Sequence, residues 1–157
     1  TRTVELADFI EDVAASARLA ANARGITLTV APVDSAIAID GDDQILTAVM
    51  GNLLQNAIKF THVDTAVTLR VQAGAERVRL EVEDECGGLP GGGDAQELAA
   101  VSAQRGTDRS GLGIGLAFSR WGAEVNGGRL YARDLPGTGC VFILELPRAT
   151  VPAPMAA

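Results

Sequence analysis

The sequence predicts an α+β protein, a two-layer sandwich in which helices cover one face of a mixed, mostly antiparallel sheet. The strand-like segments come mainly in pairs joined by short turns, and polar residues alternate with apolar ones along them. The helical segments are amphipathic, with their apolar residues on one side. Half-polar strands leave one sheet face to water, and amphipathic helices are suited to cover the other face.

The N-terminal part of the chain predicts a helix followed by two short strands. Apolar residues from Leu6 to Ala17 recur at helical spacing, and Gly25 stands where this helix would end. Residues 26–30 are β-prone, and a further short strand is expected over residues 36–39.

A strongly periodic helix is predicted over residues 44–60, after a capping turn over residues 40–43. Its apolar stripe consists of Leu46, Val49, Met50, Leu53, Leu54, Ala57 and Ile58. The elements expected after it are a hairpin over residues 67–82, a glycine-rich loop over 86–115, a helix over 113–126, and strands over 129–133 and 140–146. A loop as long as the predicted one is usually functional or disordered.

Length and composition indicate one folded domain, which we expect over residues 1–147, with a flexible tail over residues 148–157. The net charge of -7 provides no basic surface and disfavours a nucleic-acid partner. The chain has neither a signal peptide nor an apolar run that could span a bilayer, so we expect a cytoplasmic location without direct membrane insertion. Because the first residue is Thr1 rather than Met, we expect a fragment of a longer protein.

Three polar residues share one edge of the helix over residues 44–60. Asn52, Asn56 and Lys59 are spaced by four and three residues, which places them in one line away from the apolar stripe. An amide oxygen can ligate Mg²⁺, and a neighbouring lysine can meet phosphate charge. The spacing alone favours the alternative of a solvated polar face, since exposed Asn and Lys are common on helices.

Asp84 ends the second strand of the predicted hairpin. It shares parity with Val78, Leu80 and Val82, so its carboxylate is expected on the buried, helix-facing side of the sheet. A buried carboxylate needs a partner, which the exocyclic amine of a base could supply. An aspartate that caps a turn at the strand end is the equally supported alternative.

Three alternate glycines lie where the long loop becomes a helix, at Gly111, Gly113 and Gly115. Such a junction presents backbone N–H groups to an anion, although a tight structural turn explains the pattern as well. Arg105 and Arg109 precede it and could reach a terminal phosphate, yet as isolated residues they are more commonly solvated.

The other chemically distinctive residues favour structural roles. His62 has no acidic neighbour to orient it and is expected at the surface. Phe118 and Trp121 are expected in the core, and Cys86 and Cys140 as reduced thiols.

Taken in order, these segments resemble the boxes of the histidine kinase branch of a superfamily that includes gyrase, heat-shock-90 and mismatch-repair ATPases. Residues 52–61 resemble the N box, residues 84–88 the first glycine box, and residues 111–116 the second. Residues 137–139 are similar to the closing glycine turn. The resemblance extends over residues 3–147, nearly the whole chain.

The resemblance implies an ATP-binding catalytic domain that takes ATP as substrate and Mg²⁺ as cofactor. It implies that Asn56 ligates Mg²⁺, while Asn52 and Lys59 lie at the phosphates as the catalytic candidates. It also implies that Asp84 binds the adenine amine and that Phe60 packs by the base, with the long loop as a mobile ATP lid. The ATP-binding set is Asn52, Asn56, Lys59, Phe60, Asp84, Gly87, Gly88, Arg105, Arg109, Gly111, Leu112, Gly113, Ile114, Gly115 and Leu116.

The sequence departs from the family pattern in three places. Cys86 stands where the first glycine box has Gly, and Cys140 where Thr or Ser is usual. Residues 98–101 replace a lid motif of two phenylalanines, which puts docking of the lid on the partner in doubt. No phosphoacceptor helix is present, so this chain by itself is not expected to phosphorylate itself.

The function implied is transfer of the ATP γ-phosphate to a histidine on a separate dimerisation and phosphoacceptor domain, with a response regulator as an indirect partner. Asn52 supports this function, because the related ATPases carry Glu there and an amide cannot act as a general base for water. One alternative is a degenerate nucleotide-sensing or partner-binding module of the same fold. Another alternative is a stand-alone serine kinase that acts on a regulatory protein.

Overall fold

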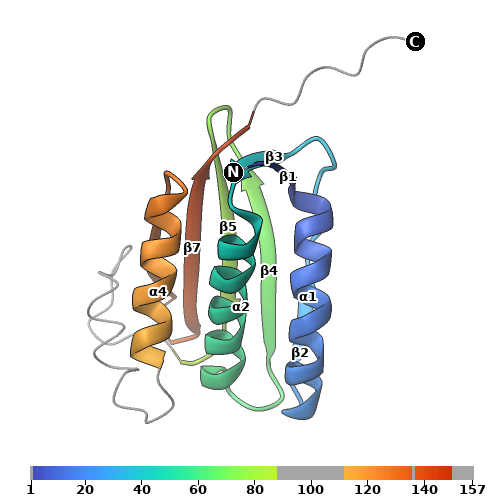
Figure 1. The fold of residues 1–157 in the computed structure, drawn as a ribbon. Coiled ribbons are helices and arrows are strands. Elements are labelled where there is room, and N and C mark those ends of the chain that lie inside the picture. The colour runs from blue at the N-terminus through green and yellow to red at the C-terminus, as the bar shows by residue number, and fades with distance from the viewer. Residues whose placement is uncertain (1, 88–111, 136, 150–157) are drawn as a thin grey trace.

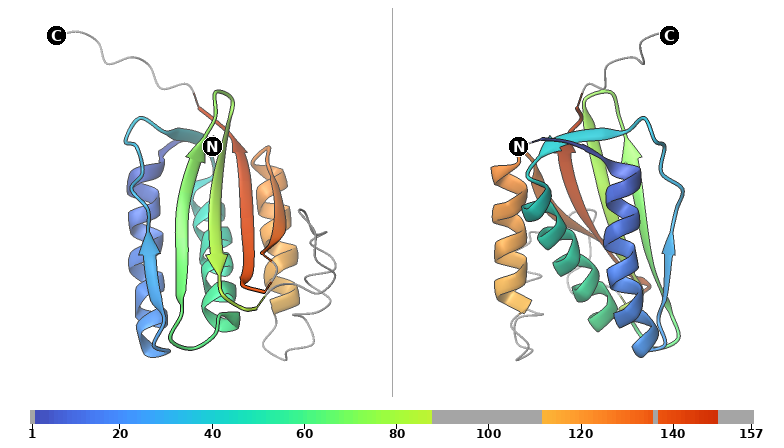
Figure 2. Two further views of the ribbon diagram at one scale, coloured as in Figure 1. Left: turned by 180° about the vertical axis from the view of Figure 1, so that it is seen from behind. Right: turned by 45° about the vertical axis from the view of Figure 1, so that its right-hand side comes forward.

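A computed structural model describes residues 2–87, 112–135 and 137–149, and for residues 112–115 it describes the backbone alone. The three helices of the described residues lie side by side over one face of a sheet, as Figure 1 shows. They are α1 (Leu6–Ala23), α2 (Asp43–Phe60) and α4 (Leu112–Val125). The views from behind and from the side in Figure 2 show the sheet as a second layer, so the predicted two-layer α+β sandwich is confirmed.

The main sheet has five strands in the order β2-β4-β5-β7-β6. Strand β2 pairs with β4 in parallel, and the remaining pairs are antiparallel. A separate two-stranded sheet joins β1 to β3 at one end of the molecule. The strands are β1 (Arg2–Glu5), β2 (Thr27–Val30), β3 (Ala38–Gly41), β4 (Ala66–Ala73), β5 (Arg77–Asp84), β6 (Arg129–Leu135) and β7 (Gly139–Pro147).

Helix α2 illustrates how local sequence signals give this fold. The side chain of Asp42 accepts a hydrogen bond from the backbone N–H of Ile45 at 3.1 Å, which confirms the predicted cap. Every residue of the predicted apolar stripe is buried, so the amphipathic face of α2 lies against the core. The end of α1 is also as predicted, since Arg24 caps the helix and Gly25, the next residue, adopts a positive φ of 70°.

Two short strands differ from the sequence prediction. Strand β1 was not predicted, and the strand expected over residues 36–39 lies instead at Ala38–Gly41. Both form because Val4 pairs with Ile39 across the small sheet and both side chains are buried. Four residues carry too little periodicity to reveal a strand whose partner is distant in sequence. Backbone hydrogen bonds continue past β7 to Ala149, two residues beyond the predicted end of the domain at residue 147.

The prediction that Trp121 belongs to the core is wrong, because its side chain is 49% exposed. Helix α4 approaches α2 closely at Gly122, where a Cβ would lie only 2.5 Å from a methyl carbon of Val49. This close approach leaves Trp121 on the outer side of α4. Phe118 is partly buried and packs against the core, with its ring centroid 5.6 Å from that of Trp121.

Candidate functional site

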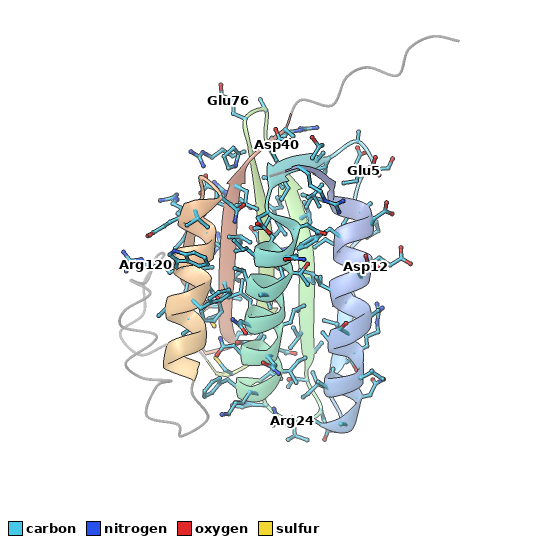
Figure 3. The ribbon with its side chains drawn as sticks, in the orientation of Figure 1. Glu5, Asp12, Arg24, Asp40, Glu76 and Arg120 are labelled. Atoms are coloured by element: carbon cyan, nitrogen blue, oxygen red, sulfur yellow. The ribbon has the colours of Figure 1, made fainter. Side chains whose placement is uncertain are left out.

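The sequence segments predicted to form the site converge at one end of the sandwich. The C-terminal end of α2, the end of β5 and the start of α4 all lie at the lower end of the molecule in Figure 1. Figure 3 shows Arg24, which follows α1, at the same end. Its guanidinium donates to the backbone carbonyl of Ile58 and, at 2.8 Å, to that of Lys59. Arg24 therefore caps the C-terminus of α2, where a positive charge stabilises the helix dipole.

Asn56 is the most unusual polar residue at this end. Its side chain is 1% exposed, and within the described part of the chain neither its amide nitrogen nor its amide oxygen has a hydrogen-bond partner. The expectation that it lies away from the apolar stripe is therefore wrong, since it is buried beside that stripe. A buried polar atom without a partner costs about 1–3 kcal/mol. A ligand that engaged the amide would remove this cost.

The other predicted residues of α2 are half-buried. Asn52 lines a groove of about 330 Å³ between α1 and α2, together with Ser16 and Gln55. The ammonium of Lys59 lies 5.7 Å from the centre of the Phe60 ring, within the range of a cation–π contact. Asn52 thus faces towards α1, whereas Asn56, one turn later, is enclosed.

Asp84 is fully buried on the helix-facing side of β5, as its parity predicts. Its Oδ1 accepts hydrogen bonds from the backbone amides of Cys86 and Cys140, each at 3.2 Å. The thiol of Cys140 donates to Oδ2 at 3.4 Å. The bond from Cys86 closes a turn two residues on, so the turn-capping interpretation is confirmed together with the buried carboxylate.

The end of β5 and the start of β7 approach each other closely at Asp84. A Cβ on Gly139 would lie 1.8 Å from the backbone oxygen of Asp84, so only glycine fits at this point of β7. Gly87 has a positive φ of 95°, and its N–H donates to the carbonyl of Thr138 at 2.8 Å. The glycines at 87 and 139 are therefore required by the backbone itself.

Thr61 joins α2 to the end of β5, a role that sequence analysis did not assign. Its hydroxyl accepts from the backbone N–H of Glu85 at 3.0 Å, and the N–H of His62 donates to the carbonyl of Glu85 at 3.1 Å. These bonds fix the helix end that carries Lys59 next to the strand end that carries Asp84. His62 itself is exposed, as predicted. The signal in the sequence that could have indicated the role of Thr61 is a polar residue directly after an amphipathic helix.

The predicted glycine-rich junction lies at the N-terminus of α4, which begins at Leu112. Residues 112–115 form its first turn, where backbone N–H groups lack helical partners. Leu116, the last residue of the predicted set, is 2% exposed and belongs to the core. Gly88, Arg105, Arg109 and Gly111, and the lid residues 98–101, lie outside the described residues.

Residues 41–150 match the family described as "Histidine kinase-, DNA gyrase B-, and HSP90-like ATPase". The chain belongs to this family. It is 30% identical over 152 residues to the sensor protein DivL of Caulobacter vibrioides, an alignment that covers 97% of the chain and 19% of DivL. It is 35% identical over 125 residues to the sensor protein TorS of Escherichia coli, covering 78% of the chain and 13% of TorS. The chain therefore spans a fifth or less of the length of these relatives.

Solved structures show the same architecture. The nucleotide-free catalytic domain of the histidine kinase ThkA superposes with a TM-score of 0.72 at 20% identity, covering 92% of this chain and 94% of that one. The mycobacterial sensor histidine kinase MprB gives a TM-score of 0.69 at 21% identity, covering 96% and 99%. At these identities the likeness shows the fold, which is that of histidine kinase catalytic domains. Among the described residues, no helix is long and apolar enough to cross a membrane.

Proposed function

We propose that this chain binds ATP together with Mg²⁺ and transfers the γ-phosphate to a histidine of a separate phosphoacceptor domain. The observation that carries the proposal is the buried amide of Asn56, which has no partner within the described residues. It lies on the same helix as Lys59 and at the same end of the fold as Asp84. An enclosed amide oxygen is a hard donor, the kind that Mg²⁺ prefers.

The predicted residues at this end of the fold suit the parts of a nucleotide. Asn56 would hold the metal ion, which when bound supplies positive charge against the phosphates. Lys59, half-buried over Phe60, would meet phosphate charge. Asp84 would accept a hydrogen bond from the exocyclic amine of adenine through its Oδ2, where the weak thiol donor of Cys140 now lies at 3.4 Å.

The chemistry of Asn52 favours phosphotransfer over hydrolysis. An amide cannot take a proton from water, so Asn52 cannot serve as the general base of an ATPase. Transfer needs an acceptor held in line with the γ-phosphate, and the described residues include only His62, which is exposed and beside a helix end. The acceptor histidine would come from another domain, and a response regulator would receive the phosphate from it. A cytoplasmic location would follow from such a partner.

A degenerate nucleotide-sensing module is the second candidate, favoured by the thiols of Cys86 and Cys140 beside Asp84. The two candidates separate in one experiment with two stages. Calorimetric titration of the chain with a non-hydrolysable ATP analogue, with and without Mg²⁺, measures binding. Incubation with γ-labelled ATP and an added phosphoacceptor domain, intact or with its histidine replaced by Ala, measures transfer.

The possible results of this experiment distinguish the kinase from the nucleotide-sensing module. Magnesium-dependent binding with label transferred only to the intact acceptor supports the kinase. Binding without transfer favours the sensing module. A folded chain that binds no nucleotide contradicts the proposal.

A further inference from the structure

Three metal-ligating side chains converge at the strand end where the base would lie. The carboxylate of Asp84 and the thiols of Cys86 and Cys140 each offer one ligand atom, and all three atoms lie within 4.8 Å of one another. They come from the last residue of β5, the turn after it and the start of β7. Asp84 and Cys140 are fully buried, and Cys86 is half-buried.

The backbone holds this cluster together. Asp84 and Cys140 are direct partners in the register of β5 and β7. Gly139 allows the two strands to approach closely at this point. The hydrogen bond from the Cys86 amide to the Asp84 carboxylate brings the second thiol round to the same side. Neither cysteine is part of a disulfide bond.

The donor set determines the kind of cation that fits. Two thiolates and a carboxylate are suited to a thiophilic divalent ion such as Zn²⁺, whereas Mg²⁺ takes oxygen ligands. In a tetrahedral zinc site with Zn–S bonds of about 2.3 Å, two sulfurs lie roughly 3.8 Å apart. The present separations, all within 4.8 Å, are close to that value. A fourth position would remain open to water.

We propose that Asp84, Cys86 and Cys140 bind a thiophilic divalent cation, and that this cation and ATP exclude each other. The proposal rests on the function assigned above to Asp84, because a carboxylate bound to a metal ion cannot accept the amine of adenine at the same time. On metal binding the two thiols lose their protons to the solvent, and the ion takes the place of the thiol hydrogen at Asp84. No oxidation or reduction takes part.

Cobalt provides a direct test, because Co²⁺ occupies tetrahedral thiolate sites and then absorbs through sulfur-to-metal charge transfer. The chain, kept reduced with a phosphine, is titrated with Co²⁺ and then with Zn²⁺. We expect a charge-transfer band that saturates at one equivalent and that Zn²⁺ removes. The band should be lost in Cys86→Ser and in Cys140→Ser. It should persist in Glu85→Gln, which alters the acidic residue between the cluster members.

A second measurement tests whether the divalent cation and ATP exclude each other. The affinity for the ATP analogue in excess Mg²⁺ is measured with and without one equivalent of Zn²⁺, in the wild-type chain and in the double variant Cys86→Ser, Cys140→Ser. We expect Zn²⁺ to weaken binding in the wild type alone. Chelation of Zn²⁺ by the nucleotide is the same in both proteins and cannot produce this difference.

The outcomes separate this proposal from the one on which it rests. A missing band, or one that survives both cysteine substitutions, overturns the metal site even where ATP binds normally. A normal band in a chain that binds no nucleotide supports the metal site and contradicts the ATP assignment. Cys86 is half-buried, so Cys86→Ser keeps the test valid even where substitution of the buried Cys140 prevents folding.

Discussion

Strand β5 carries two buried carboxylates, three residues apart, on opposite faces of the sheet. Glu81 lies on the face that no helix covers, here called the open face, yet its side chain is only 2% exposed. The guanidinium Nε of Arg70 lies 2.8 Å from its Oε1. Asp84 is fully buried on the helix-covered face, where two backbone amides and a thiol donate to it. A buried charge needs compensating partners on either face. Glu81 is compensated by an opposite charge, whereas Asp84 is compensated by hydrogen bonds from uncharged donors.

On the open face, which no helix covers, the glutamates form ion pairs with arginines of the same sheet. Arg70 bridges Glu81 and Glu83, while Arg129 and Arg77 both reach Glu145 on the neighbouring strand. Burial opposes the charge of Arg70, yet its hydrogen bonds with Glu83 and Glu81 raise the pKa of its guanidinium. The three buried or half-buried glutamates of this face are thus paired with arginines of the same sheet, which is the arrangement of a structural surface.

At the lower end of the helix-covered face, the buried polar groups are not paired with opposite charges. Asn56 has no partner within the described residues, and Asp84 is held by donors that a ligand amine could supplement or replace. A buried amide whose described neighbours offer it no hydrogen bond, as at Asn56, therefore indicates a ligand site more strongly than a buried carboxylate with an arginine partner, as at Glu81. Four substitutions test this distinction.

Replacement of Asn56 by Leu, which has the same branched shape, should abolish magnesium-dependent binding of ATP. The same change should raise the free energy of unfolding by about 1–3 kcal/mol, because it removes buried polar atoms that lack partners. Calorimetric titration and urea denaturation measure the two effects. Unchanged affinity would remove Asn56 from the site, and a loss of stability would show that its amide is satisfied in the folded chain.

Replacement of Asp84 by Asn should weaken binding of the ATP analogue roughly 10- to 100-fold, since a hydrogen bond to a charged group is worth about 1.5–3 kcal/mol. One acceptor oxygen becomes a donor, which opposes the amine of adenine. The matched control is Glu81→Gln on the other face of β5, which should leave the affinity unchanged. Equal losses in both variants would mean that the effect comes from the fold rather than from the base.

Replacement of Arg70 by Met should leave nucleotide affinity unchanged and lower the free energy of unfolding by about 1–3 kcal/mol. The cause is Glu81, whose buried carboxylate would lose its guanidinium partner. Urea denaturation and the same titration check both statements. A change in affinity without a change in stability would contradict the division between the two faces.

Replacement of Arg129 by Met provides the smallest expected effect. Its side chain is 67% exposed, and the buried Glu145 that it bridges at 3.0 Å keeps a second guanidinium partner in Arg77 at 3.7 Å, so the loss should be below about 1 kcal/mol. Compared with Arg70→Met, this variant measures how much burial of the arginine adds to an ion pair with a buried glutamate on the same face. A loss as large as that of Arg70→Met would show that exposure does not decide the worth of these pairs.

Local pattern was sufficient to predict most of the secondary structure. Helices α1 and α2, the β4–β5 hairpin and the pair β6–β7 follow from periodicity and turn residues, which act over a few neighbouring positions. The helix-facing side of Asp84 also follows, because parity along a strand is a local property. The roles proposed for Asn52, Asn56, Lys59 and Asp84 come from a resemblance and remain predictions.

The tertiary structure alone decided how distant segments meet. It paired β1 with β3, enclosed Asn56, turned Trp121 outward through the contact of Gly122 with Val49, and brought the thiols of Cys86 and Cys140 to the carboxylate of Asp84. Each of these outcomes depends on contacts between residues far apart in the chain. The residue types and their order determine which helices and strands form, but burial is set by what packs against each side chain, and sequence spacing does not contain that information.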